Sequence, residues 1–273
     1  MTNGTRLLPT RMQLIDIGAN LTHKSFDPDR NQVIDRAREA GVVRMIVTGS
    51  SVACSRQAKA LAAEYPGVLY STAGIHPHHA AETQTGDREA LAGLLQKENV
   101  VAAGECGLDY FRNFSPKEDQ RRVFTMQLEL AAEHRMPVFL HQRDAHDDFV
   151  AILKEYVPKI PRAVAHCFTG NGDELDGCLE LGLYIGITGW ICDERRGGHL
   201  KDLVATIPLN RLMVETDSPY LLPRDLDPKP GNRRNEPMYL PHIVQSIAEA
   251  RGIEALELAA ATARTSEQFF ALP

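Results

Sequence analysis

The feature that most limits the fold of this chain is a series of eight short apolar segments separated by longer amphipathic stretches. They begin about 20–37 residues apart, which leaves room for a crossover helix between parallel strands. The expected strands cover residues 14–18, 43–49, 68–75, 100–104, 137–140, 162–165, 183–187 and 211–216. The expected helices cover residues 29–40, 53–64, 87–97, 116–135, 144–156, 172–181, 198–206 and 240–250.

Eight strand–helix units predict an α/β fold of the (β/α)8 TIM-barrel type, whose usual size is about 250 residues. The 273 residues of this chain fit that size, and a doubly wound open sheet is the alternative. The chain has no G-x-G-x-x-G after the first expected strand and no G-x-x-x-x-G-K-[ST], which argues against nicotinamide and P-loop chemistry. We expect a flexible N-terminal arm over residues 1–13 and a single barrel domain over residues 14–273.

Composition excludes several other classes. The five cysteines are odd in number and form no C-x-x-C pair, so neither a disulfide framework nor structural zinc is expected, and a reducing cytoplasm suits the chain. The first thirteen residues lack the apolar core of a signal peptide, and every apolar run is shorter than the roughly 18 residues of a membrane helix. The net charge of −6 argues against non-specific coating of nucleic acid but allows an enzyme with a local basic or metal-lined cleft.

Polar residues lie at the ends of most of the expected strands, which is where a TIM barrel places its chemistry. They are Asp16 and Asn20 at the first strand, His76 and His78 after the third, Glu105 after the fourth, His141 after the fifth, His166 after the sixth and Asp217 after the eighth. A single histidine after a strand is more often a hydrogen-bonded loop residue than a ligand. Ligand-type residues after four of the last five strands would instead converge around one axis.

A mixed set of histidines and carboxylates predicts a divalent metal site and makes residues 14–273 a metallohydrolase domain. Such a site lowers the pKa of bound water and polarises a phosphoryl or carbonyl oxygen. Asp217 is expected to be a metal ligand or the general base for that water. Protein nucleophiles are less expected, because no G-x-S-x-G elbow is present and strand-end cysteines such as Cys106 and Cys167 are usually small buried fillers.

Long sequence blocks carry a resemblance that runs from about residue 13 to about residue 270. They are DIGANLT (16–22), TAGIHPH (72–78), GECGLDYFRNFSP (104–116), PVFLHQRDAH (137–146), AHCFTG (165–170), YIGITGWICDERRG (184–197), ETDSPYLLP (215–223) and RRNEP (233–237). With these blocks in this order, the chain resembles the TatD family of metal-dependent deoxyribonucleases.

The resemblance assigns roles to residues that their strand-end positions had already singled out. It implies that Glu105, His141 and His166 are metal ligands, that Asp217 is a ligand or base, and that His76 lies near the scissile phosphate. Many family members carry H-x-H after the first strand, where this chain has Gly18 and Asn20. We therefore expect one firmly held ion and, at most, a weak second-metal or substrate site near Asp16, Asn20 and His78. The loss of two histidines favours Mg²⁺ or Mn²⁺ over Zn²⁺.

The resemblance implies a 3′→5′ exonuclease on single-stranded DNA and RNA, acting in DNA repair, with metal-bound water attacking phosphorus. Basic side chains must then hold the substrate phosphates, and the candidates are Arg143, Arg195, Arg196, Arg233 and Arg234. Aromatic residues on the same loops either stack on bases or cover the barrel core; they are Tyr110, Phe111, Phe114 and Trp190. We expect a monomer that acts in the cytoplasm without a membrane partner.

Two other functions remain open at this level, because a fold does not fix a function. One is a metal hydrolase that cleaves a small cyclic amide, an ester, or the ester of a misacylated tRNA. The basic loop residues favour a phosphodiester over a small neutral substrate. The other is an inactive barrel that binds nucleic acid or protein, and the joint presence of Glu105, His141, His166 and Asp217 argues against it.

Overall fold

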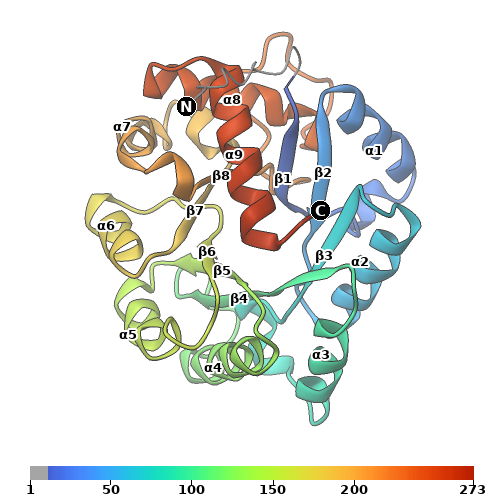
Figure 1. Cartoon of the computed structure of the whole chain (residues 1–273), viewed down its shortest axis with the longest axis vertical. Coiled ribbons are helices and arrows are strands. Elements are labelled where there is room, and N and C mark those ends of the chain that lie inside the picture. Colours follow the sequence, from blue (N-terminus) through green and yellow to red (C-terminus); the bar gives the residue numbers. More distant parts are fainter. Residues whose placement is uncertain (1–11) are drawn as a thin grey trace, which may run out of the picture.

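A computed structural model describes residues 12–273 of the chain, and eight parallel strands in it form one sheet in sequence order. The strands are β1 (Leu14–Ala19), β2 (Val42–Val47), β3 (Leu69–Ala73), β4 (Val100–Asp109), β5 (Val138–Arg143), β6 (Ala163–Ala165), β7 (Tyr184–Ile187) and β8 (Leu212–Val214). Figure 1 shows most of the helices arranged around the outside of these strands. Of the expected N-terminal arm, residues 1–11 lie outside the described part of the chain.

The barrel closes where its first and last strands meet. Ala19 and Ser218 form a parallel bridge, the Asn20 N–H donates to the Ser218 carbonyl at 2.7 Å, and the Asp217 N–H donates to the Gly18 carbonyl at 2.8 Å. An open sheet would leave β1 and β8 far apart. The predicted (β/α)8 barrel is therefore confirmed, and the doubly wound alternative is wrong.

The helices follow the strands as the amphipathic segments predict. They are α1 (Arg30–Glu39), α2 (Val52–Glu64), α3 (Asp87–Leu95), α4 (Lys117–His134), α5 (His146–Tyr156), α6 (Gly172–Glu180), α7 (Gly198–Thr206), α8 (Leu240–Arg251) and α9 (Ala255–Phe270). Helix α4 buries Phe124, Leu128 and Ala131 at a helical spacing against the barrel. In residues 12–273, no helix is both long and apolar enough to cross a membrane.

The last helix, α9, was not expected as a separate element, and it closes one end of the barrel. Phe269 and Phe270 pack inside the barrel with Ile15, Ile17 and Phe139. Arg162, which precedes β6, donates to the Phe269 carbonyl at 3.2 Å, so α9 ends at the amino-terminal end of the strands. Figure 1 shows α9 lying over the barrel. Only the opposite, carboxyl-terminal end is left for a site.

Strands β4 and β5 extend further than expected, to residues 109 and 143 instead of 104 and 140. The extra residues pair with each other, Gly107 with His141 and Asp109 with Arg143. Gly104 has a φ of +124°, a backbone conformation that glycine adopts without strain, and a Cβ there would collide with the Phe139 carbonyl. Glu105 and His141 therefore lie within paired strands at the barrel mouth instead of in loops.

Candidate active site

A cleft of about 870 Å³ lies at the carboxyl-terminal ends of the strands. Every strand end contributes to its lining; one residue from each, in order, gives Asn20, Ser50, His76, Glu105, His141, His166, Trp190 and Asp217. The closed end of the barrel beneath it is apolar. The fold thus brings the polar residues that follow distant strands to one hollow, as their positions in the sequence predict.

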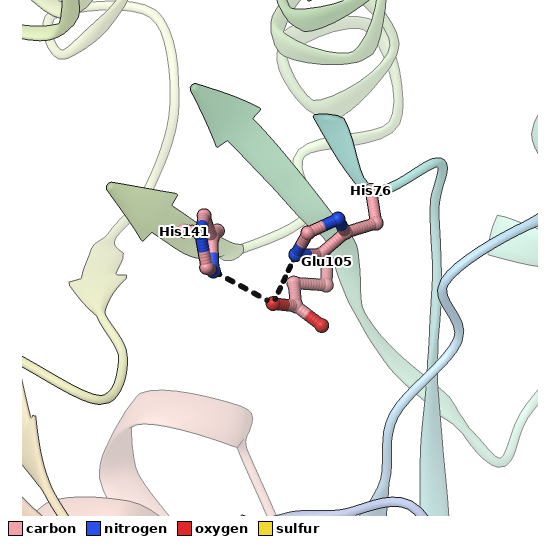
Figure 2. Close-up of side chains that lie close together, drawn as sticks. All are labelled: His76, Glu105 and His141. Carbon is pink, nitrogen blue, oxygen red and sulfur yellow. Dashed lines mark hydrogen bonds and ion pairs between the residues drawn. The ribbon is translucent and has the colours of Figure 1, made fainter. Parts of the chain in front are cut away.

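One carboxylate oxygen is the centre of this cleft. Glu105 Oε1 lies 2.8 Å from His166 Nε2, 3.1 Å from His141 Nδ1 and 3.2 Å from His76 Nε2. Figure 2 shows His76 and His141 pointing ring nitrogens at this oxygen from two sides. Glu105, His76 and His166 are buried. The sequence predicted Glu105, His141, His166 and Asp217 as ligands, with His76 nearby. The structure brings the three histidines together around Glu105, and Asp217 lines the same cleft.

The charges of the buried groups are set by one another. Burial opposes the charged form of Glu105, but the surrounding histidines hold the pKa of its carboxyl well below the usual range. Burial likewise opposes the charged form of His166, yet Glu105 and Glu215 raise its pKa well above normal. Burial lowers the pKa of His76 to about 4, so that ring is neutral. Its Nδ1 accepts from the His78 N–H at 3.0 Å, which leaves the proton on the Nε2 that faces Glu105.

Asp109, which the sequence analysis missed, is the second carboxylate of the site. Its Oδ2 lies 2.7 Å from His78 Nε2 and 3.5 Å from His141 Nε2, and His141 Nε2 makes no hydrogen bond among the described residues. His141 therefore stands between two carboxylates. Glu105 and Asp109 are four residues apart in an extended strand, so they share one face of it; this spacing is the signal that could have identified Asp109.

Glu215 is a third carboxylate that the sequence analysis did not single out. It is fully buried, its Oε2 lies 3.3 Å from His166 Nδ1, and its Oε1 accepts the Cys167 N–H at 2.5 Å. Two glycines leave room for it: a Cβ on Gly186 would stand 2.5 Å from its Oε1, and a Cβ on Gly18 would collide with its Oε2. Glu215 therefore fixes the orientation of the His166 ring from below.

The predicted second-metal or substrate residues separate into two groups. Asn20 and His78 line the cleft, and Asn20 Nδ2 donates to Asp217 Oδ1 at 2.9 Å. Asp16 is fully buried and lies beneath the cleft. Its carboxylate accepts from the Thr216 N–H at 2.9 Å and from the Thr216 hydroxyl at 2.5 Å. Burial raises the pKa of both Asp16 and Asp217 to about 7.

Some of the predicted phosphate-binding arginines line the cleft, and others do not. Arg143, Arg196 and Arg233 line the cleft, and so does Arg112, which was not predicted. Arg234 is held instead by Asp29 at 2.7 and 2.8 Å and by Glu236 at 2.6 Å. Arg195, whose side chain is 56% exposed, pairs with Asp193 at 3.3 Å, and Asp193 also pairs with Arg196 at 2.8 Å. Neither Arg195 nor Arg234 is among the residues that line the cleft.

A divalent cation fits the centre of the cleft. Glu105 and His141 each offer a ligand atom, and these atoms lie within 4.8 Å of each other and of a ring nitrogen of His76; His166 Nε2 faces the same Glu105 oxygen. The buried His141 Nε2 has no hydrogen bond among the described residues. Mixed imidazole and carboxylate donors are typical of divalent metal sites.

A second group of ligand-type residues lies outside the cleft and is accounted for by protein contacts. His242 Nε2 lies 2.7 Å from Asp225 Oδ1, and the Cys192 thiol donates to the Ser246 hydroxyl at 3.4 Å. These contacts tie α8 to the loops that follow β7 and β8. Burial raises the pKa of the Cys192 thiol to about 12, and it also raises those of the Cys106 and Cys167 thiols, so all three are neutral thiols at pH 7.

A β/α barrel with a cluster of histidines and carboxylates at its carboxyl-terminal end defines the metal-dependent hydrolase class of barrels. Residues 15–271 match the model of the TatD related DNase family, and the chain belongs to this family. The resemblance drawn from its motif blocks is thus confirmed.

The chain matches relatives over most or all of their length. The chain is 54% identical over 259 residues to a 3′-5′ ssDNA/RNA exonuclease TatD from Erwinia tasmaniensis, covering 95% of this chain and 100% of the relative. It is 56% identical over 238 residues to a protein of the same name from Yersinia pseudotuberculosis, covering 87% of this chain and 92% of the relative. A solved structure of a TatD homologue from Escherichia coli K12 has a TM-score of 0.87 at 30% identity, over 95% of this chain and 98% of that one.

Proposed function

We propose that this protein is a divalent-metal-dependent nuclease that removes nucleotides from the 3′ end of single-stranded DNA and RNA. The observation that carries the proposal is the meeting of Glu105 Oε1 with nitrogens of three histidines, at 2.8–3.2 Å, in the floor of a wide cleft. Relatives that are 54% and 56% identical bear the name of this activity. Arginines on the cleft wall favour a phosphodiester over a small neutral substrate.

Each residue of the site has a proposed role in such a reaction. Glu105, His141 and His166 would hold the ion, with Asp217 as a ligand or as the base that takes a proton from water. A bound divalent ion supplies Lewis acidity, which activates water and withdraws charge from a phosphoryl oxygen. His76 presents a neutral Nε2–H at the same centre, where it can donate to a phosphate oxygen.

Arginines complete the proposed phosphate site. The Arg143 guanidinium carbon lies 3.9 Å from the centre of the Phe111 ring, and that of Arg196 lies 4.3 Å from the centre of the Trp190 ring. These aromatic contacts orient planar guanidinium groups at the cleft, where that of Arg143 can bind phosphate through two hydrogen bonds. Asp193 already holds Nε and Nη2 of Arg196 at 2.9 and 2.8 Å, so Arg196 contributes positive charge to the cleft wall. Arg233 adds a third positive charge from the loop after β8.

The donor set bears on the choice of ion. Carboxylate oxygens from Glu105, Asp217 and the nearby Asp109 suit Mg²⁺ or Mn²⁺, whereas imidazoles suit Zn²⁺. We propose Mg²⁺ as the activating ion, with Mn²⁺ and Zn²⁺ as alternatives. We also propose that residues 14–273 act as one domain, in a monomer in the cytoplasm, with a role in DNA repair; the five free cysteines suit a reducing compartment.

The test uses one single-stranded oligonucleotide labelled at the 3′ end in one sample and at the 5′ end in another, with Mg²⁺, Mn²⁺, Zn²⁺ or EDTA. Wild type is compared with Glu105→Ala and Asp217→Asn, and with Glu180→Gln, which changes an exposed carboxylate at the end of α6. We expect metal-dependent, stepwise shortening from the 3′ end by wild type and Glu180→Gln only. Absence of cleavage with every metal, in protein shown to bind an ion, would overturn the proposal.

A further inference from the structure

Three large apolar side chains are exposed in residues 12–273, and all three lie at the barrel mouth. Phe111 is 53%, Phe114 68% and Tyr220 52% exposed. Large hydrophobic side chains are normally buried, and their gathering at one place on a surface marks a binding site. Here they gather around the cleft, since Phe114 and Tyr220 line it and Phe111 contacts Arg143 of the cleft wall.

Phe114 and Tyr220 face the cleft from opposite sides. Phe114 follows β4 and Tyr220 follows β8, and in a closed sheet ordered β1 to β8 these two strands are half a turn apart. Phe114 packs edge-to-face on His78, with ring centres 4.7 Å apart, and Tyr220 packs edge-to-face on His23 at 5.7 Å. The ligand group around Glu105 lies between them in the same cleft.

The exposed aromatic rings are of two kinds. The Phe111 ring is covered by the Arg143 and Arg112 guanidinium groups. Among the described residues, no arginine or lysine lies over Phe114 or Tyr220. Phe111 therefore orients a cation toward phosphate, whereas Phe114 and Tyr220 keep exposed ring surface for an apolar, planar ligand.

We propose that Phe114 and Tyr220 are base-stacking residues that hold the two nucleobases on either side of the bond to be cut. This inference rests on the proposed nuclease function and names the substrate contacts that it needs. Stacking accepts any base, because every base has a π face. It requires the two bases to separate from each other, which a paired duplex end resists, and so it favours single strands.

The test measures binding in EDTA, so that cleavage does not interfere. The probe is a 5′-fluorescein single-stranded DNA oligonucleotide, compared with the same strand carrying abasic residues at its last two 3′ positions. Phe114→Leu and Tyr220→Leu remove the rings, and Phe114→Trp and Tyr220→Phe restore a ring. Tyr156→Leu, which removes a ring on α5, is the matched control.

We expect each leucine variant to weaken binding of the intact strand about tenfold or more, in line with the effect of losing one stacked base. The ring-restoring variants and Tyr156→Leu should bind like wild type. Wild type should bind the abasic-ended strand as weakly as the leucine variants do. Equal affinity of wild type for the two strands, or equal loss on both strands in the leucine variants, would overturn the stacking assignment.

The same proteins are then assayed for cleavage with Mg²⁺, Mn²⁺ and Zn²⁺. Ring-dependent binding without cleavage by wild type in any metal would reject the nuclease function and leave the base-stacking assignment standing. Cleavage of the intact strand by wild type together with ring-independent binding would reject the base-stacking assignment and leave the nuclease function standing. The two proposals therefore fail in different measurements.

Discussion

Glu215 Oε2 lies 3.3 Å from His166 Nδ1, while the other nitrogen of the same ring lies 2.8 Å from Glu105 Oε1. The imidazole is thus clamped between a carboxylate in the cleft and one beneath it. A partner of this kind fixes the orientation of a ligand ring and raises its basicity. It also explains why two glycines, Gly18 and Gly186, pack against Glu215.

Replacing Glu215 should weaken metal binding although Glu215 is not among the proposed ligands. We expect Glu215→Gln to lower the affinity for Mn²⁺ about 10–100-fold, the usual effect of losing such a partner, as measured by isothermal titration calorimetry. Gly18→Ala should act in the same direction, because its Cβ would displace the carboxylate. Glu180→Gln is the control, and an unchanged affinity in Glu215→Gln would show that His166 is oriented without it.

The hydrogen bond from Asn20 to Asp217 should matter for turnover. Asn20→Ala leaves Asp217 without its amide donor, and hydrogen bonds to charged groups contribute about 1.5–3 kcal/mol. We expect kcat to fall about tenfold or more on a single-stranded oligonucleotide, with little change in KM. Asn20→Asp should lose more, because a second carboxylate would repel Asp217. A kcat equal to that of wild type in both variants would contradict this role.

Removal of the metal should lower thermal stability. An ion present at 100 times its Kd stabilises the folded state by about 2.7 kcal/mol, which for a chain of this size corresponds to a rise in Tm of about 5 °C. Differential scanning calorimetry with Mg²⁺, Mn²⁺ or Zn²⁺ against EDTA measures this rise. Glu105→Ala and His141→Ala should show no rise, and a rise that persists in both would place the bound ion elsewhere.

The Asp29–Arg234 ion pair should make stability depend on pH in the acid range. The Arg234 hydrogen bonds lower the pKa of Asp29 to about 2, below its value of about 3.9 in an unfolded chain. The resulting stability is complete above about pH 4 and is lost as the pH falls toward 2. Asp29→Asn should cost about 1 kcal/mol at pH 7 after allowance for solvent screening.

Urea unfolding at pH 7 and at pH 2.5 tests this expectation. The difference between wild type and Asp29→Asn should shrink at the lower pH. Asp27→Asn removes a more exposed partner of Arg30 and should change the free energy of unfolding little at either pH. A penalty for Asp29→Asn that is the same at both pH values would mean that its charge is not responsible.

Local patterns predicted most of this fold, and the exceptions have physical causes. Apolar runs and amphipathic stretches identify strands and helices because burial follows their periods, and the polar residue that ends a run then marks the barrel mouth. Asp109 was missed because β4 continues through a glycine-rich stretch whose pairing with β5 is not visible in either segment alone. Glu215 was missed because it lies within an expected strand, where a charge has no partner until the barrel closes.

Long-range partners decided which basic residues face the cleft. Arg234 lies in the same motif block as Arg233, but Asp29, which is 205 residues away in sequence, holds its side chain. Arg233 lines the cleft one position earlier. The sequence shows that this loop is positively charged. Only the three-dimensional contacts show which of its two adjacent arginines forms structural ion pairs and which one lines the cleft.

The seam between β1 and β8 has a consequence for when activity can arise. Asp217 joins that seam through its own backbone N–H, so its position depends on the first strand and the last one together. A ribosome releases Glu105, His141 and His166 well before the residues that close the barrel. A chain synthesised only to the end of α6 therefore contains Glu105, His141 and His166 but lacks the residues that complete the cleft, and we expect it to be unable to degrade the messenger RNA from which it is being translated.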